Sequence, residues 1–246
     1  MKLRVVVSGD RPDLAEQMNG PGFADGWPEF IFHDATAALY RERRQQYFGH
    51  LDLLLVDADD RVVAGGWGVP IRWDGDTSTL PGGYTPANAL AVEQHEAGDT
   101  PDTLVVQAAQ VHNDLRGKGL AEAMLTGLVE TGAGHDLTRV VAPVRPTLKP
   151  RYPLTPMARF VTWTRADGLP LDPWLRTHVR MGAEILGVAE RSMVMTGTVA
   201  EWESWAGMAF PDSGDYVVPH AFSPVRIDRA ADRGELVEPN VWVRHR

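Results

Sequence analysis

Six residues near the middle of the chain carry its clearest chemical signal: Arg116, Gly117, Lys118, Gly119, Leu120 and Ala121. They lie between an apolar run at residues 103–111 and an amphipathic stretch at residues 121–130, an order that predicts a strand, a glycine loop and a helix. Such a junction directs free backbone N–H groups and the positive end of a helix dipole to one point. Glycines let the backbone approach an anion closely. The segment therefore predicts a pyrophosphate-binding site, to which the two cationic side chains add charge.

Two well-known phosphate-binding loops do not fit this segment. The P-loop needs the spacing G-x-x-x-x-G-K-[ST], which the chain lacks. The dinucleotide-binding fingerprint needs G-x-G-x-x-G or A. Gly117 and Gly119 supply its first two positions, but Glu122 occupies the third, where a carboxylate would crowd the helix–strand packing and repel phosphate. A dinucleotide-dependent oxidoreductase is therefore disfavoured, while an ordinary strand-to-helix turn stays open as the structural alternative.

The loop resembles the acetyl-CoA-binding loop of the GNAT acyltransferase superfamily, [QR]-x-x-G-x-[GA]. Arg116, Gly119 and Ala121 match this pattern in register, and Gly117 gives its frequent R-G-x-G-x-A form. The resemblance extends in order across roughly residues 1–195. It implies that acetyl-CoA is the co-substrate and that its pyrophosphate is bound by the loop and the end of the preceding strand, namely by Val111, Arg116, Gly117, Lys118, Gly119, Leu120 and Ala121.

The resemblance also implies how the thioester is polarised. In this superfamily the strand before the loop splays from its neighbour, and a backbone N–H of the strand faces the thioester oxygen. The corresponding stretch here is residues 108–111. One such donor is worth roughly 3 kcal/mol of transition-state stabilisation. A plain core strand without a bulge is the structural alternative.

A second stretch is predicted to supply the acid that protonates the departing thiolate. The superfamily often places a tyrosine in a pattern close to Tyr-x-x-x-Gly-Phe. The matching stretch begins at His178, has the glycine at Gly182 and replaces the phenylalanine with Ala183. Histidine titrates near neutral pH, so His178 is the predicted acid. Tyr152 and Tyr216 are weaker alternatives.

The proton of the attacking amine needs an acceptor. In the resembling superfamily such bases often precede the central strand, where this chain has Glu93, His95 and Glu96. Glu93 is the predicted base. His112, just past the strand, is an alternative, either as a supporting group or as a turn residue. Bulk water is a further acceptor.

The elements that must position these residues follow from periodicity and turn signals. Strands are predicted at 3–7, 51–56, 61–69, 103–111, 139–144, 191–197, 216–218 and 236–243, and helices at 12–18, 34–48, 90–97, 121–130, 173–185 and from 198. Asp34 is expected to cap the second of these helices, and Thr198 and Glu201 to form a capping box at the start of the last. This order is also that of GNAT proteins. We therefore expect an α/β (α+β) fold with a mixed, mainly antiparallel sheet flanked by helices. Residues 1–195 would form the core, and residues 196–246 a C-terminal extension packed on it within one domain.

Composition limits the classes of function. The chain has 246 residues and a net charge of −9, with no basic run, which disfavours a nucleic-acid partner. It has no cysteine, so disulfides and thiolate chemistry are excluded. No H-E-x-x-H or G-x-S-x-G motif occurs, so neither a metal nor a serine nucleophile is expected. No apolar run approaches about 18 residues, and none suits a signal peptide, which predicts a cytoplasmic protein without a membrane partner.

The combined prediction is an acetyl-CoA-dependent N-acetyltransferase that acts on the amine of a small molecule by direct transfer. Two alternatives stay open: a CoA-binding or metabolite-sensing module without turnover, and a transferase of the same fold with another acyl donor. The acidic charge of the chain disfavours a donor such as aminoacyl-tRNA. The identity of the amine is not encoded in any motif, and the apolar tail is compatible with a homodimer contact.

Overall fold

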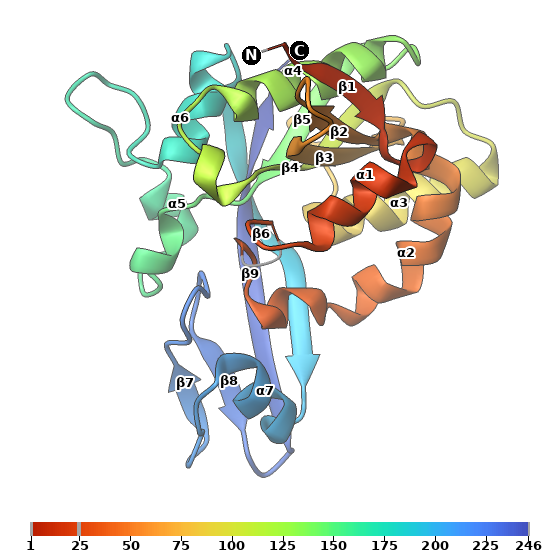
Figure 1. Ribbon diagram of the computed structural model, residues 1–246. Helices are drawn as coiled ribbons and strands as arrows, with labels where there is room; N and C mark the ends of the chain where they lie inside the picture. The colour runs from red at the N-terminus through yellow and green to blue at the C-terminus, as the bar shows by residue number, and fades with distance from the viewer. Residues whose placement is uncertain (1, 24–25, 246) are drawn as a thin grey trace.

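A mixed sheet forms the centre of the molecule. The computed structural model describes residues 2–23 and 26–245. In this part of the chain nine strands join one sheet, in the order β1-β2-β3-β4-β5-β9-β8-β7, with β6 paired to β9 (Figure 1). The strands are β1 (Arg4–Val7), β2 (Asp52–Val56), β3 (Val62–Ile71), β4 (Thr103–Val111), β5 (Arg139–Val144), β6 (Glu184–Gly197), β7 (Gly214–Tyr216), β8 (Val225–Asp228) and β9 (Arg233–Arg244).

Pairing in this sheet is antiparallel except between β4 and β5. The helices are α1 (Pro12–Ala15), α2 (Ala35–Phe48), α3 (Tyr84–Ala97), α4 (Leu120–Ala133), α5 (Met157–Phe160), α6 (Pro173–Arg180) and α7 (Val199–Ala206). The predicted mixed, mainly antiparallel sheet flanked by helices is confirmed.

The side chains of β4 divide the helices between two faces of the sheet. Leu104 and Val106 join a core cluster with α4, α5 and α6. Val105 points the other way, into a cluster with α2 and α3. This alternation is the ordinary period of a strand buried on both faces. As a result, α4 and α6 stand over one face of β4 and β5, and α2 and α3 over the other.

A buried carboxylate fixes the start of α2 as predicted. Asp34 caps the helix, with Oδ1 accepting from the Ala37 N–H at 3.0 Å. Its Oδ2 accepts from Thr85 Oγ1 of α3 at 2.7 Å and from the Val194 N–H of β6 at 3.0 Å. One side chain therefore ties α2, α3 and β6 together, and these three elements surround the cavity described below.

Two helix boundaries differ from the prediction. α3 begins at Tyr84, not at residue 90, because Gly83 takes a φ of +136° and the Tyr84 N–H then donates to Ser192 Oγ at 2.7 Å. α6 ends at Arg180, not at residue 185, because Gly182 adopts a left-handed φ of +89°. The long strand β6 follows at once, so the late apolar residues belong to the sheet.

The last fifty residues contribute to the central sheet. β9 pairs with β5 and runs beside β6 for most of its length, and the boundary predicted at residue 196 falls inside β6. β7, β8 and α7 surround the far ends of β6 and β9, in the lower part of Figure 1. The predicted capping box of α7 is confirmed, with Thr198 and Glu201 bonded reciprocally.

In the described residues, no helix is long and apolar enough to cross a membrane. Among the same residues, no three acidic or histidine side chains gather as metal ligands would.

Candidate active site

The sheet opens between β4 and β5. The two strands pair only over residues 103–105 and 139–141. Beyond that point β5 stays with β9 while β4 stays with β3. A bulge marks the place where they part, because Trp67 faces Ala108 and Gly68 faces Val106, which leaves Gln107 without a partner in the ladder. The strand next to the glycine loop is therefore both splayed and bulged.

The bulge changes the face of the sheet on which the later side chains of β4 lie. Val106 packs on the side of α4, and so do Ala109 and Val111. Strict alternation would have placed Ala109 on the opposite face. The extra residue absorbs the difference, so Gln107 and Ala108 both lie on the side away from α4.

A cavity of about 430 Å³ lies over the opening, on the α4 side. We call it the α4–α6 cleft. Its wall includes Val111 of β4, Arg116 and Ala121 of the glycine loop, Val144 of β5, and Trp174 and His178 of α6. Three of the residues predicted to bind the coenzyme, Val111, Arg116 and Ala121, therefore line the same cleft as the predicted acid.

The glycine loop has the conformation that an anion site needs. Gly117 and Gly119 have left-handed φ angles of +77° and +76°, and no atom lies within 4 Å of a Cβ built on either. α4 begins at Gly119 without a side-chain cap, so its first N–H groups have no partner inside the helix. Lys118 is exposed, whereas the side chain of Leu120 is buried in the core. Leu120 can therefore offer a ligand only its backbone.

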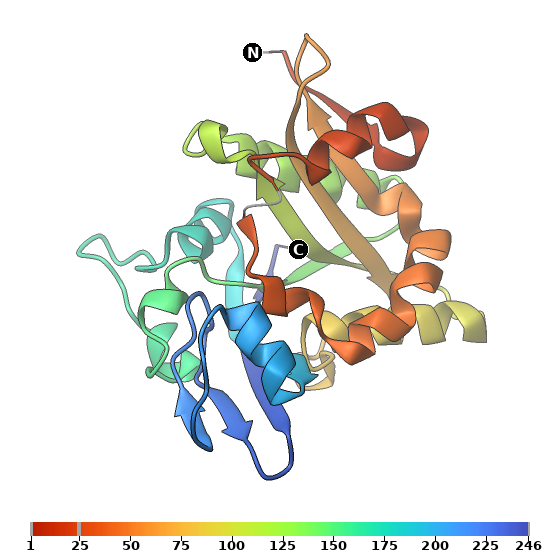
Figure 2. The same cartoon turned by 60° about the horizontal axis from the view of Figure 1, so that its bottom comes forward.

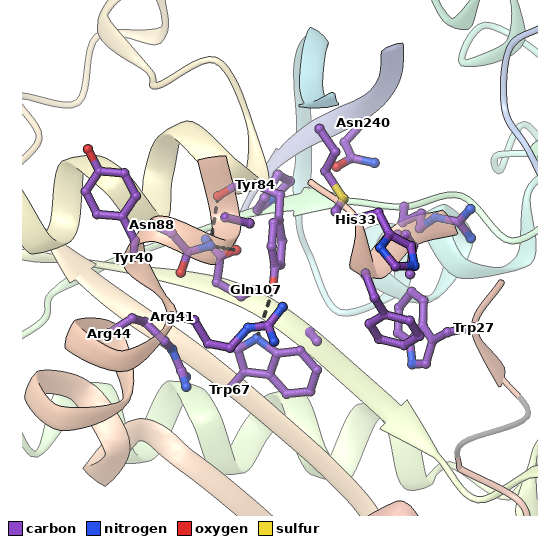
Figure 3. Close-up of a pocket in the computed structure, with 17 residues that line it drawn as sticks. Trp27, His33, Tyr40, Arg41, Arg44, Trp67, Tyr84, Asn88, Gln107 and Asn240 are labelled. Carbon is purple, nitrogen blue, oxygen red and sulfur yellow. Dashed lines mark hydrogen bonds between the residues drawn. The ribbon is translucent and has the colours of Figure 1, made fainter. Parts of the chain in front are cut away.

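A second cavity of about 660 Å³ lies on the opposite face of the sheet, beside α2 and α3. We call it the aromatic pocket, because ring side chains form much of its wall: Trp27, Phe32, His33, Tyr40, Trp67 and Tyr84. Figure 3 shows the rings of Trp67 and Tyr84 standing near Gln107. The Trp67 Nε1–H donates to the Tyr84 hydroxyl at 3.4 Å.

The two cavities meet at the opening of the sheet. Both are lined by the same five residues, which come from the splayed strands and the segments next to them: Trp27, Gln107, Ala108, Pro143 and Arg145. A ligand bound along the α4–α6 cleft and a ligand in the aromatic pocket would therefore face each other at Gln107. Figure 2 shows the elements on both sides of this opening.

The amide of Gln107 presents an unused donor at this junction. Asn88 Nδ2 donates to the Tyr84 carbonyl and to Gln107 Oε1, both at 3.0 Å. A carbonyl only accepts, so the amide of Asn88 is fixed, and it fixes in turn the amide of Gln107 with Nε2 as the free end. Gln107 is only 7% exposed, and its Nε2 has no partner among the described residues. Leaving such a donor unpaired costs about 1–3 kcal/mol.

His178 lies in the wall of the α4–α6 cleft, but it is not the near-neutral acid that the sequence predicts. Its side chain is buried, with Nδ1 2.8 Å from His245 Nε2. Burial, and then the neighbouring His245, lower the pKa of His178 to about 3. The imidazole is therefore neutral at neutral pH, because a charged ring would lose its hydration. A role for His178 in proton transfer stays a prediction, restricted to the neutral ring.

This burial gives a testable pH dependence. In the unfolded chain His178 binds a proton below its ordinary pKa of 6.5, whereas the folded protein excludes that proton until about pH 3. Stability therefore falls as pH drops through this window. Between pH 7 and pH 5, the free energy of unfolding of wild type should fall by about 2 kcal/mol more than that of His178→Gln. Urea titrations at both pH values measure the difference, and parallel pH profiles of the two proteins would contradict it.

Glu93, the predicted base, lies outside both cavities. It is exposed on α3, and its Oε1 accepts from the Tyr40 hydroxyl at 2.7 Å. Tyr40 lines the aromatic pocket, so Glu93 reaches that pocket only through the phenol. The hydrogen bond to Glu93, and then burial, raise the pKa of Tyr40.

The other candidate side chains have structural partners. Glu96 binds Arg43 and the Tyr47 hydroxyl, and the ring of His95 packs on that of Tyr47. The weaker alternatives His112, Tyr152 and Tyr216 also line neither cavity. None of these assignments is tested by the geometry alone, and Glu93 stays the predicted base.

Sequence reasoning missed Gln107 at the junction and the residues of the aromatic pocket. Gln107 stands within an apolar strand, and no spacing rule distinguishes a bulged residue from its neighbours. The pocket draws on segments far apart in the chain, from Trp27 to Asn240. Only the tertiary fold brings these residues together.

Comparisons with known proteins show which proteins this chain is similar to. No family model matches the chain. Over 265 residues it is 28% identical to "Arginine N-acetyltransferase avaD" of Aspergillus versicolor, across 96% of this chain and 91% of that protein. Two solved structures share its fold. The loading GNATL domain of CurA from Lyngbya majuscula gives a TM-score of 0.54 at 17% identity, over 99% of this chain and 96% of that one. The GphF GNAT-like decarboxylase in complex with isobutyryl-CoA gives 0.53 at 18%, over 78% and 90%. The chain therefore has the fold of GNAT proteins, as the predicted resemblance implies.

Proposed function

We propose that this chain, which has the GNAT fold, transfers an acetyl group from acetyl-CoA to the amine of a small molecule. The observation that supports the proposal is the junction at Gln107, where a cleft beside the uncapped start of α4 shares five lining residues with a separate pocket. The first cavity suits a long phosphorylated donor and the second an acceptor. The curated relative is named for the same class of reaction, which supports the choice.

The residues of the α4–α6 cleft fit coenzyme A. The free N–H groups at the start of α4 and the left-handed glycines before it form an anion site, and Arg116 and Lys118 add positive charge. Val111 and Val144 provide apolar walls beyond the loop. We propose that this loop holds the pyrophosphate and that the acyl end lies at Gln107. The coenzyme supplies an activated thioester, and the protein orients and polarises it.

Gln107 has the chemistry that the acyl oxygen needs. An attacking amine must keep its lone pair free and lose a proton, so it gains nothing from a hydrogen-bond donor. The acyl oxygen gains negative charge during attack, and a fixed donor stabilises that charge. We therefore assign Gln107 Nε2 as a donor to the acyl oxygen, together with a backbone N–H of residues 108–111.

Proton movements would use the groups on either side of the junction. On the acceptor side, we propose that Tyr40 takes the proton of the amine while its own hydroxyl proton passes to Glu93, to which it is hydrogen-bonded. On the donor side, we propose that the neutral ring of His178 faces the departing sulfur and donates a hydrogen bond from Nε2, which has no described partner, while the thiolate takes its proton from water. Both roles rest on position and are separate from the acyl-binding role of Gln107.

Two measurements on the intact chain test the proposed function. Calorimetric titration should give micromolar binding of acetyl-CoA and none of NADH or adenosine. Release of the CoA thiol should then rise above the hydrolysis rate when a suitable amine is added, with arginine included among the amines. Binding without thiol release across the amines would instead favour a sensing module. The absence of any acetyl-CoA binding would leave the glycine loop as a structural turn and remove the activity with it.

A further inference from the structure

The aromatic pocket carries positive charge, although the chain as a whole is acidic. Three guanidinium groups belong to its lining, those of Arg41, Arg44 and Arg145. No aspartate or glutamate belongs to the lining among the described residues. An amine is itself a cation at neutral pH, so a pocket of this composition disfavours an acceptor that carries only positive charge.

Two of these guanidinium groups have carboxylate partners behind the pocket. Arg145 forms a two-bond pair with Glu238, at 2.7 and 3.0 Å. Arg44 Nη1 binds Asp52 at 2.8 Å, and Nη2 binds the other oxygen of the same carboxylate. The Nε of Arg44 is nevertheless buried and without a partner among the described residues. Arg44 therefore keeps one donor available even though its charge is balanced.

Arg41 is the uncompensated charge. It has neither an ion pair nor a hydrogen bond to a described residue, and it extends from α2 toward Trp67 in Figure 3. Residues three apart lie on the same face of a helix, so Arg41 and Arg44 present their side chains together. The positive charges of these two arginines also affect Tyr84. Burial raises the pKa of the Tyr84 phenol, and the charges of Arg44 and Arg41 oppose that rise.

We infer that the aromatic pocket binds an acceptor that carries a carboxylate as well as its amine, on an apolar or aromatic body, and that Arg41 and Arg44 bind the carboxylate. The class is that of amino acids with large apolar side chains. The rings of Trp27, Trp67 and Tyr84 would contact the body of the acceptor, while the amine faces Gln107. Polyamines and other acceptors with positive charge alone are disfavoured. The inference rests on the proposed function and specifies its acceptor.

Matched pairs of amines test this inference directly. Each pair differs only in the carboxylate: phenylalanine and phenethylamine, tryptophan and tryptamine, arginine and agmatine. With thiol release as the assay, we expect kcat/KM at least tenfold higher for the carboxylate member of the two aromatic pairs. Equal or better use of phenethylamine and tryptamine would overturn the inference. A preference confined to agmatine or spermidine would overturn it as well.

A substitution of Arg41 tests whether this residue causes the preference for acceptors with a carboxylate. Arg41→Gln should reduce the ratio within each aromatic pair below about threefold, mainly by raising KM for the amino acid. The kcat/KM for phenethylamine should not fall, because the variant removes a charge that repels its ammonium group. Arg226→Gln is the control, because Arg226 is likewise exposed on β8, without a described partner, and outside both cavities. An unchanged ratio in Arg41→Gln would contradict the assignment.

Calorimetry on the same wild-type protein distinguishes failure of this inference from failure of the proposed function. If acetyl-CoA binds and no amine is acetylated, the proposed function fails, and calorimetry with phenylalanine and phenethylamine still tests the pocket. Binding of phenylalanine that Arg41→Gln weakens at least tenfold would support the carboxylate site. Failure of wild type to bind phenylalanine in preference to phenethylamine would overturn it.

Discussion

Replacement of Gly119 with glutamate is expected to weaken acetyl-CoA binding about 100-fold, or roughly 2.8 kcal/mol. Two effects act together at this position. Gly119 has a φ of +76°, which costs a residue with a Cβ about 1–2 kcal/mol. The new carboxylate would also stand at the start of α4, where the free N–H groups are proposed to hold the pyrophosphate, and its charge would repel that group.

Two further variants separate strain from charge. Gly119→Ala introduces the strain alone, and we expect it to weaken binding no more than about tenfold. Gly98→Glu introduces the same strain and charge at the end of α3, where Gly98 has a φ of +78° and lies outside both cavities. Calorimetric titration of all three variants with acetyl-CoA measures the difference. Equal binding by wild type and Gly119→Glu would mean that the loop holds no pyrophosphate.

The sequence predicted most reliably what local chemistry determines. The strand at residues 103–111 and the strand at residues 139–144 are confirmed with the same bounds, because apolar β-branched runs bounded by turn residues have few alternatives. The helix cap at Asp34 and the capping box at Thr198 are confirmed for the same reason. These features depend on residues a few positions apart.

Features that depend on distant contacts were missed. The start of α3 depends on a bond between Tyr84 and Ser192, more than a hundred residues later. The shift of the His178 pKa depends on burial beside His245, which no local pattern indicates. The aromatic pocket needs β9 in the middle of the sheet, although its sequence looks like a tail. Motif matching therefore identified residues of the proposed donor cleft and gave no information on the proposed acceptor pocket.

The loss of the free donor at Gln107 is expected to lower kcat about 100-fold, the usual effect of removing one donor to a developing negative charge. In Gln107→Met the side chain keeps its length and loses the amide. Asn88 Nδ2 keeps its bond to the Tyr84 carbonyl, but its other N–H loses Gln107 Oε1 as an acceptor. Binding of acetyl-CoA should change less than about threefold, because the donor acts mainly on charge that develops during attack.

A stability measurement distinguishes this role from a structural one. Removal of a buried polar group that serves the fold destabilises a protein, whereas removal of a donor with no partner relieves a cost of about 1–3 kcal/mol. The substitution also leaves one N–H of Asn88 without its acceptor, which costs a similar amount. Gln107→Met should therefore unfold at about the same temperature as wild type, while its kcat falls by a similar factor for every acceptor amine. Gln94→Met is the matched control, since that glutamine of α3 already bonds both backbone groups of Arg72 outside the two cavities. A lower unfolding temperature with kcat within threefold of wild type would instead assign Gln107 to the core. Reduced kcat together with unchanged or raised stability would identify it as a donor held unpaired for the acyl oxygen.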